Sequence, residues 1–193
     1  MSMRFAVALA VCVCGLSASS VLAQETWNTV VLSSSPKVTI DVPDSAGDVL
    51  DGATGDNLMF LALGEQSGGE LVCTVLRHPY GPDFDRKAMT QGLGKPQRLC
   101  PEVSPTMREY TIDEAATFSQ DDLDAVVCTA SYLDSAKDLP AEIRSIQLIL
   151  APDAGYSIAC HASHEDIEAA SDAWIFLWSA MVRRMQDSLH VAQ

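Results

Sequence analysis

The chain has 193 residues, and its 26 acidic side chains outnumber 12 Lys and Arg, for a formal net charge of −14 at pH 7. This balance excludes the usual basis of nucleic-acid binding, because Lys and Arg contacts to phosphate supply most non-specific affinity, and it opposes adsorption to an anionic membrane surface. A basic partner protein would instead be attracted.

Residues 1–23 have the pattern of a secretory signal peptide. Arg4 precedes an apolar run from Phe5 to Leu16, and the ending Val21-Leu22-Ala23 fits a signal-peptidase site. The run is too short to cross a bilayer as a helix, which takes about 20 residues, so stable membrane insertion is not expected. We expect cleavage near Ala23, a periplasmic or secreted location, and a single domain over residues 24–193.

Four cysteines remain after that cleavage: Cys73, Cys100, Cys128 and Cys160. An even number of cysteines in an exported protein predicts disulfides, here two. Three connectivities are open. We expect pairing between nearest neighbours in the sequence, Cys73–Cys100 and Cys128–Cys160.

The first half of the chain predicts strands followed by short helices. Apolar, β-branched runs broken by "SSSP" predict a hairpin over residues 28–42, and two further strands are predicted over 58–63 and 70–77. The Gly- and Asp-rich segment 47–57 predicts an exposed loop. Short helices are predicted after Asp83 ("DRKAMTQ") and over "TIDEAATF", where Thr111 and Glu114 have capping-box spacing.

The second half predicts three strands and a helix. The strands cover 124–133, 145–151 and 155–162, and "PDAG" forms a tight turn between the last two. Apolar residues at three- and four-residue steps, Trp174 and Trp178 among them, predict an amphipathic helix over 164–189. The predicted fold class is α+β, with an antiparallel sheet packed against a long C-terminal amphipathic helix and short helices in the middle of the chain.

The stretch "RHPYGPDFDR", residues 77–86, is the best candidate for a polar binding surface. It gathers polar and charged side chains where a strand enters a loop, a common place for functional groups. These side chains are Arg77, His78, Tyr80, Asp83, Asp85 and Arg86, of which we take Arg77, His78, Tyr80, Asp83 and Arg86 as the candidate surface. The plainer interpretation is a turn set by proline and glycine that carries ordinary surface charges.

The stretch "ACHASHED", residues 159–166, raises the question of a metal site. Cys160, His161 and His164 lie close in sequence, but a zinc site needs three or four ligands, usually at recognisable spacing, and no C-x-x-C or H-E-x-x-H is present. We therefore interpret Cys160 as a disulfide cysteine and Ser163 as a helix cap. No G-x-S-x-G elbow or phosphate-binding loop occurs either, so we assign no catalytic residue, no cofactor and no metal.

The layout of the predicted elements resembles a known group. The stretches that carry it are "VTIDVPDS", "LMFLAL" and the hairpin "SIQLILAPDAGYSIACHA" running into "AWIFLWSAMVRRMQDSLHV". This order resembles the PsbP/Mog1-like small α+β domains, in which helices flank an antiparallel sheet. The resemblance implies a binding, chaperone or assembly-accessory role and brings no catalytic motif, and a fold alone does not fix function.

The leading hypothesis is therefore an exported, disulfide-stabilised binding or accessory protein that engages another protein, a basic one by charge, in the periplasm. One alternative is a small periplasmic hydrolase or metal-dependent enzyme that uses the 77–86 loop with His161 or His164. A second is a small-ligand carrier with an apolar cavity between sheet and helix, beside Trp174 and Trp178.

Overall fold

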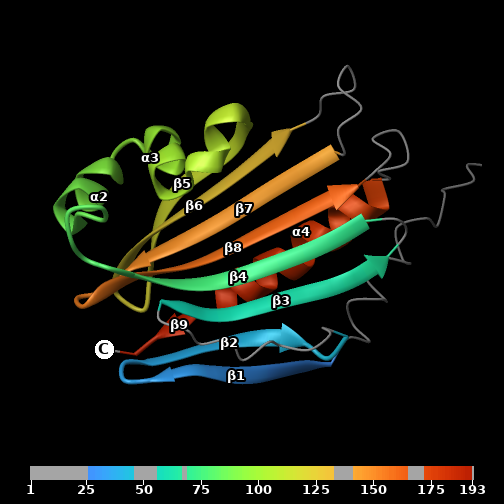
Figure 1. The fold of residues 1–193 in the computed structure, drawn as a ribbon, viewed down its shortest axis with the longest axis horizontal. Coiled ribbons are helices and arrows are strands. Elements are labelled where there is room, and N and C mark those ends of the chain that lie inside the picture. The colour runs from blue at the N-terminus through green and yellow to red at the C-terminus, as the bar shows by residue number, and fades with distance from the viewer. Residues whose placement is uncertain (1–25, 46–55, 67–68, 133–140, 165–171, 193) are drawn as a thin grey trace, which may run out of the picture.

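The computed structural model describes residues 26–45, 56–66, 69–132, 141–164 and 172–192, which form two antiparallel sheets and a few helices (Figure 1). The large sheet has the strand order β3-β4-β8-β7-β6-β5, and the small sheet has the order β1-β2-β9. The large sheet comprises β3 (Asn57–Gln66), β4 (Gly69–Pro79), β5 (Thr111–Gln120), β6 (Leu123–Tyr132), β7 (Ala141–Leu150) and β8 (Ala154–His164). The small sheet comprises β1 (Trp27–Ser34), β2 (Lys37–Pro43) and β9 (His190–Val191).

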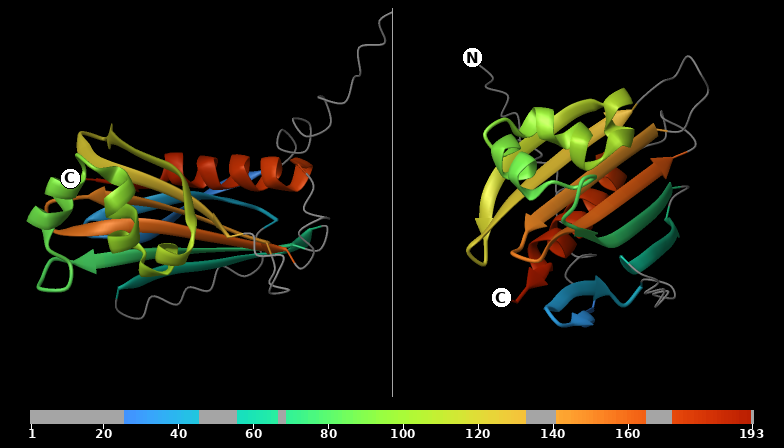
Figure 2. Two further views of the ribbon diagram at one scale, coloured as in Figure 1. Left: turned by 90° about the horizontal axis from the view of Figure 1, so that it is seen from above. Right: turned by 60° about the vertical axis from the view of Figure 1, so that its left-hand side comes forward.

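The helices lie on opposite faces of the large sheet (Figures 1 and 2). One face is covered by α4 (Asp172–Ser188), and part of the other is covered by α2 (Arg86–Gly92), α3 (Pro96–Val103) and the 3-10 helix η1 (Pro105–Glu109). Among the described residues, no helix is long and apolar enough to span a membrane.

Period-2 alternation in the strands supplies a core on each face. On the α4 face, Met181 and Met185 of the helix share a buried cluster with Leu61, Cys73 and Ile158 of the sheet. The second cluster joins the short helices to the central strands. Its members include Met89, Leu99, Cys100, Val103, Met107, Cys128, Ile146 and Leu148.

Most of the predicted strands are confirmed. The hairpin predicted over 28–42 is β1 and β2, joined through a cis Ser35–Pro36 peptide bond. The other predicted strands, apart from small shifts of their ends, are β3, β4, β6, β7 and β8. The "PDAG" turn is closed by a hydrogen bond from Ala151 N to Ala154 O of 3.1 Å. The segment predicted as a loop over 47–57 lies almost entirely outside the described residues.

The helix predicted over "TIDEAATF" is wrong, because this segment is strand β5. Its residues pair with β6 from Thr111 through Gln120. Ile112 and Ala115 pack against the second core cluster. A capping-box spacing is a local preference, and a neighbouring strand with an apolar face overrides it.

The start predicted for the C-terminal helix is also wrong. The helix begins at Asp172 and has 17 residues, so the long helix expected over 164–189 is not found. β8 continues instead to His164, which is paired with Gly69 on one side and Ala141 on the other. Backbone hydrogen bonds to strands on both sides stabilise the extended conformation more than a single helix cap at Ser163 would stabilise a helix.

The four cysteines form two disulfides, as predicted, but the expected pairing is wrong. Cys73 is bonded to Cys160 and Cys100 to Cys128. β4 and β8 are neighbours, so Cys73 lies directly opposite Cys160, with 4.1 Å between their Cα atoms. Cys100 reaches Cys128 because α3 packs across β6.

Candidate functional site

The chain leaves β4 at Pro79 and enters α2 through a tight, well-bonded turn. Gly81 N donates to Phe84 O at 3.1 Å. Asp85 is the N-cap of α2, because its carboxylate accepts a hydrogen bond of 2.7 Å from the backbone N–H of Lys87. This end of the sheet is therefore the Pro/Gly turn and short helix that the sequence predicts.

Phe84 contacts two of the predicted surface residues, and a third contacts one of these two. Its ring stacks on His78, with centroids 4.9 Å apart, and on Tyr80, with centroids 6.0 Å apart. The guanidinium carbon of Arg86 lies 5.6 Å from the centroid of the Tyr80 ring. His78, Phe84, Tyr80 and Arg86 thus form one stacked group, in which Arg86 is added through Tyr80.

The polar atoms of this group make contacts inside the fold. His78 Nε2 lies 2.8 Å from Ser157 Oγ, and the Tyr80 hydroxyl donates to Ala151 O at 2.7 Å. Burial lowers the pKa of His78 and raises the pKa of Tyr80. Ser157 has no exposed surface, so its contact with His78 does not form an accessible nucleophile and base.

Arg77 and Asp83 do not join the group. Arg77 lies 3.5 Å from Asp56 and 3.4 Å from Asp153, two exposed carboxylates that hold it beside the β7–β8 turn. Asp83 is exposed and makes no hydrogen bond or ion pair with the described part of the chain. The structure therefore brings together only part of the predicted surface.

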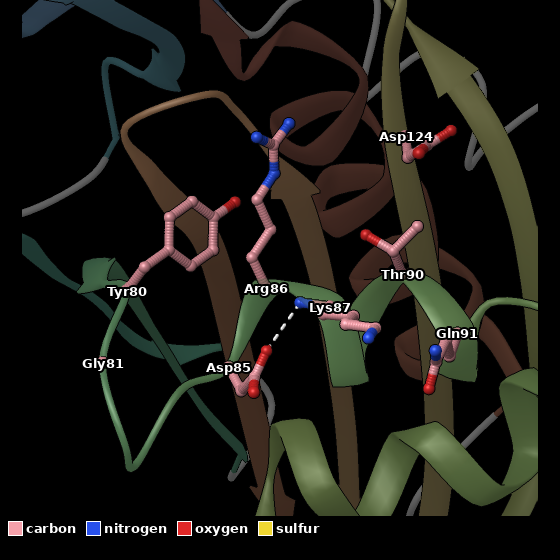
Figure 3. Close-up of a pocket in the computed structure, with 8 residues that line it drawn as sticks. All are labelled: Tyr80, Gly81, Asp85, Arg86, Lys87, Thr90, Gln91 and Asp124. Carbon is pink, nitrogen blue, oxygen red and sulfur yellow. Dashed lines mark hydrogen bonds between the residues drawn. The ribbon is translucent and has the colours of Figure 1, made fainter.

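An open groove of about 730 Å³ lies beside Tyr80 and Arg86 (Figure 3). Its lining residues are Tyr80, Gly81, Asp85, Arg86, Lys87, Thr90, Gln91 and Asp124. The side chains of Lys87, Thr90, Gln91 and Asp124 are exposed and have no polar partner among the described residues. The groove offers a mixture of charges and hydroxyl groups, which suits binding of a polar surface.

Four of these lining residues lie outside the predicted stretch 77–86. Thr90 and Gln91 follow Lys87 by about one helical turn on α2, so the helical periodicity after Asp85 was the sequence signal that could have identified them. Asp124 belongs to β6, and only the sheet order places it beside α2.

The "ACHASHED" residues point to different sides of the sheet. Cys160 turns toward the α4 face and its disulfide, whereas His161 lies on the opposite face, with its Nε2 3.4 Å from Glu142 Oε2. The side chain of His164 lies outside the described residues. Within the described segments, no group of three or more His, Cys, Asp or Glu is arranged to hold a metal ion.

Glu142 is the centre of a second polar cluster on that face. It accepts a hydrogen bond from the Tyr110 hydroxyl, and its carboxylate lies 3.5 Å from Arg144 Nη2. Arg144 also donates to the Tyr110 hydroxyl at 3.0 Å and to Thr106 Oγ1 at 3.1 Å. These mutual contacts tie η1 and the residue after it to β7, and a small cavity of about 170 Å³ lies beside Arg144 and His161.

The loop at 77–86 and His161 are not brought together. His78 is paired with Gly155, and His161 is paired with Val72, which lies six residues before His78 in β4. Six residues of strand span about 20 Å. The side chains of Trp174 and Trp178, around which a ligand cavity was expected, lie outside the described residues.

An antiparallel sheet flanked by helices is the arrangement that the resemblance to PsbP/Mog1-like domains implied. Comparison with solved structures confirms that resemblance. The chain is similar to Mog1p, a Ran-binding protein of Saccharomyces cerevisiae, with a TM-score of 0.55 and 13% identity over 87% of this chain and 96% of that chain. It is also similar to LpqN of Mycobacterium tuberculosis, described as involved in cell envelope biogenesis, with a TM-score of 0.51 and 10% identity over 88% and 92% of the two chains.

A cyanobacterial PsbP from Synechocystis aligns with a TM-score of 0.48 and 10% identity, covering 86% of this chain and 93% of that chain. No protein-family model matches the sequence, and no curated protein matches it. At these identities the likeness is one of fold alone.

Proposed function

We propose that this chain is an exported, disulfide-stabilised accessory protein that acts by binding another protein. The observation that carries this proposal is which polar groups at the end of β4 contact the interior and which are exposed. His78 and Tyr80, the groups best suited to proton transfer, make contacts inside the fold. The exposed groups around them line an open groove and are polar and accessible, as the rim of a protein-binding surface is.

Export is supported by the state of the cysteines. All four cysteines of residues 24–193 pair in two disulfides and are buried. Such bonds form and persist in oxidising compartments and are rare in the cytosol. The signal-like pattern of residues 1–23 and the likeness to LpqN, described as involved in cell envelope biogenesis, are compatible with the same location.

A protein partner is supported by the fold and by the charge. Mog1p, which shares the fold, is described as a Ran-binding protein. The net charge of −14 favours a partner that carries basic groups and predicts that association weakens as salt is added.

The proposal is tested with the full-length chain expressed in a bacterial host with a periplasm. We expect the periplasmic protein to lack residues 1–23 and to have the mass of a form with two disulfides. The immobilised protein should then retain a basic partner from envelope extract of the source organism at about 20 mM salt and release it at about 500 mM, where screening is strong. Cytosolic retention with free thiols would contradict export, and the absence of any salt-sensitive partner would contradict the binding role.

A further inference from the structure

β5 is the open edge of the large sheet. It is paired with β6 on one side, and no other described strand is bonded to it. The opposite edge, β3, lies beside the small sheet and contacts β1 (Figure 1). β5 has ten residues and keeps a regular register with β6 from Glu114 to Gln120. An edge of this length presents a row of backbone N–H and C=O groups to an incoming strand.

An exposed aromatic residue lies on this edge. Phe118 is 39% exposed and shares a strand face with Glu114 and Ala116. All three border a groove of about 260 Å³ between the edge of the sheet and α4. On the α4 side, this groove is lined by Arg183, Gln186 and Asp187. A strand laid along β5 would place alternate side chains over this groove and cover the Phe118 ring.

The same edge is strongly acidic. The edge strand and the turn that ends it, residues 111–122, contain no Lys, Arg or His, and their four carboxylates are those of Asp113, Glu114, Asp121 and Asp122. Asp187 of α4 adds a fifth at the groove. Asp121 pairs with His190 at 2.5 Å and Glu114 with Arg183 at 3.6 Å, while the side chains of the other three have no ionic partner among the described residues.

This charge selects among the possible occupants of the edge. A second copy of β5 would bring the same carboxylates to the contact, and like charges facing each other across strands are destabilising. A segment with Lys or Arg would meet complementary charge instead. Charged residues can also protect an edge strand against aggregation. An exposed aromatic side chain such as Phe118 works against that protection, so protection alone does not account for this edge.

We infer that an extended, basic segment of the partner docks on the β5 edge and becomes the seventh strand of the large sheet. The inference rests on the proposed function and names the surface and the chemistry of the partner. Backbone hydrogen bonds to β5 hold the segment, its basic side chains meet Glu114 and Asp187, and one apolar side chain covers Phe118. The groove beside Tyr80 does not select charge in this way, because Arg86 and Lys87 there oppose Asp85 and Asp124.

The probe for this surface is a fluorescein-labelled ten-residue peptide that alternates lysine and valine. Two matched peptides replace lysine by glutamate or every second valine by proline, which removes backbone donors. The protein is the disulfide-bonded mature chain, and binding is followed by anisotropy and by amide chemical shifts. We expect binding of the lysine peptide at low salt, none of the glutamate peptide, and at least about a tenfold loss with proline. The shifted amides should lie in β5.

Phe118→Ala should weaken binding of the lysine peptide about tenfold, as loss of an aromatic anchor does. The matched control is Phe60→Ala, because Phe60 is 36% exposed and lies on β3, the opposite edge strand of the sheet. A second variant, Asp122→Asn, should weaken binding a few fold at low salt only. Asn tolerates the positive φ of 63° at this position, so the turn is kept.

Equal losses for Phe118→Ala and Phe60→Ala, shifts confined to other strands, or no binding of the lysine peptide would overturn the inference. The proposed function is tested separately with the partner captured from envelope extract. If Phe118→Ala still binds that partner with full affinity, the β5 edge is not the docking site, although the binding role stands. If no partner is captured, the binding role itself fails.

Discussion

The ring of Phe84 covers Gly155 at the start of β8 so closely that no side chain fits between them. A Cβ atom at position 155 would lie 2.7 Å from Phe84 Cε1 and 3.1 Å from a methyl carbon of Leu148. Phe84 also stacks on His78 and Tyr80. One buried glycine therefore permits the stacked group that forms one side of the groove.

Gly155→Ala should lower the free energy of unfolding by about 1–3 kcal/mol, because the added methyl group displaces the Phe84 ring from a packed site. Urea unfolding measures the change, and near-ultraviolet circular dichroism reports the displaced aromatic rings. The control is Gly81→Ala in the adjacent turn, where a Cβ atom would meet nothing within 4 Å. Equal stability of the two variants would show that Phe84 does not depend on this glycine.

The two disulfides should differ in their contribution to stability. Cys73–Cys160 joins residues 87 apart in sequence, whereas Cys100–Cys128 joins residues 28 apart. The chain-entropy model gives about 4.5 kcal/mol for the first and about 3.5 kcal/mol for the second. We expect the variant with both Cys73 and Cys160 replaced by alanine to be the less stable of the two double variants in urea. The reverse order would mean that packing of α3, not loop closure, dominates.

Local patterns predicted the strands well because their information lies within the segment itself. The alternation in 155–162 and the "PDAG" turn are properties of adjacent residues, and β7 and β8 pair as expected. The segment 111–118 was misassigned because Thr111 and Glu114 fit a helix start, while the pairing that makes it a strand comes from β6. The disulfide pairing depended in the same way on the order of the strands, which sequence spacing does not encode.

The candidate site was predicted only in part, because local patterns identify residues within one segment but not residues that the strand order brings together. Tyr80 and Arg86 were identified from a strand end rich in polar residues, and they do line the groove. Arg77 was included with them, although alternation along β4 places it on the other side of the strand from His78. Asp124 belongs to a distant strand, and its position beside α2 required the sheet order.

The C-terminal end of α4 is held by a buried amide network. Gln147 is 2% exposed, and its Nε2 donates to Gln120 Oε1 at 2.7 Å and to Gln186 O at 2.9 Å. Gln147→Leu should lower the free energy of unfolding by about 1–3 kcal/mol, because it leaves buried acceptors without a donor. The exposed substitution Gln91→Leu should change it by no more than about 0.5 kcal/mol. A Gln147→Leu protein as stable as the Gln91→Leu control would show that the network contributes no net stability.

His78 should make stability depend on pH near neutrality. Burial lowers the pKa of His78 below its ordinary value of 6.5, so the folded state binds this proton less readily than the unfolded state. The contribution of His78 is therefore complete above pH 6.5 and is lost as the pH falls from 6.5 through the lowered value. Urea unfolding across this range should show a smaller decline for His78→Gln than for the wild type. Parallel curves would mean that burial does not perturb this imidazole.

Glu142 should make the stability of the fold depend on pH in the acidic range. Burial, the largest single influence, tends to raise the pKa of Glu142, but the hydrogen bond from Tyr110 and the charges of His161 and Arg144 together lower it below its ordinary value of 4.5. A carboxyl whose folded pKa is depressed contributes stability above its unfolded pKa and loses that contribution as the pH falls through the folded value. Glu142→Gln should therefore cost about 1 kcal/mol at neutral pH, as loss of a charge-assisted contact does, and little once the carboxyl is protonated.

The matched control for Glu142→Gln is Glu114→Gln. The Glu114 side chain is 48% exposed and lies 3.6 Å from Arg183, a surface ion pair expected to contribute less than about 0.5 kcal/mol at any pH. Urea unfolding of both variants at neutral and acidic pH separates the two cases. A Glu142→Gln deficit that persists undiminished in acid would mean that the side chain acts through packing, because a charge effect must vanish when the wild-type carboxyl is neutral.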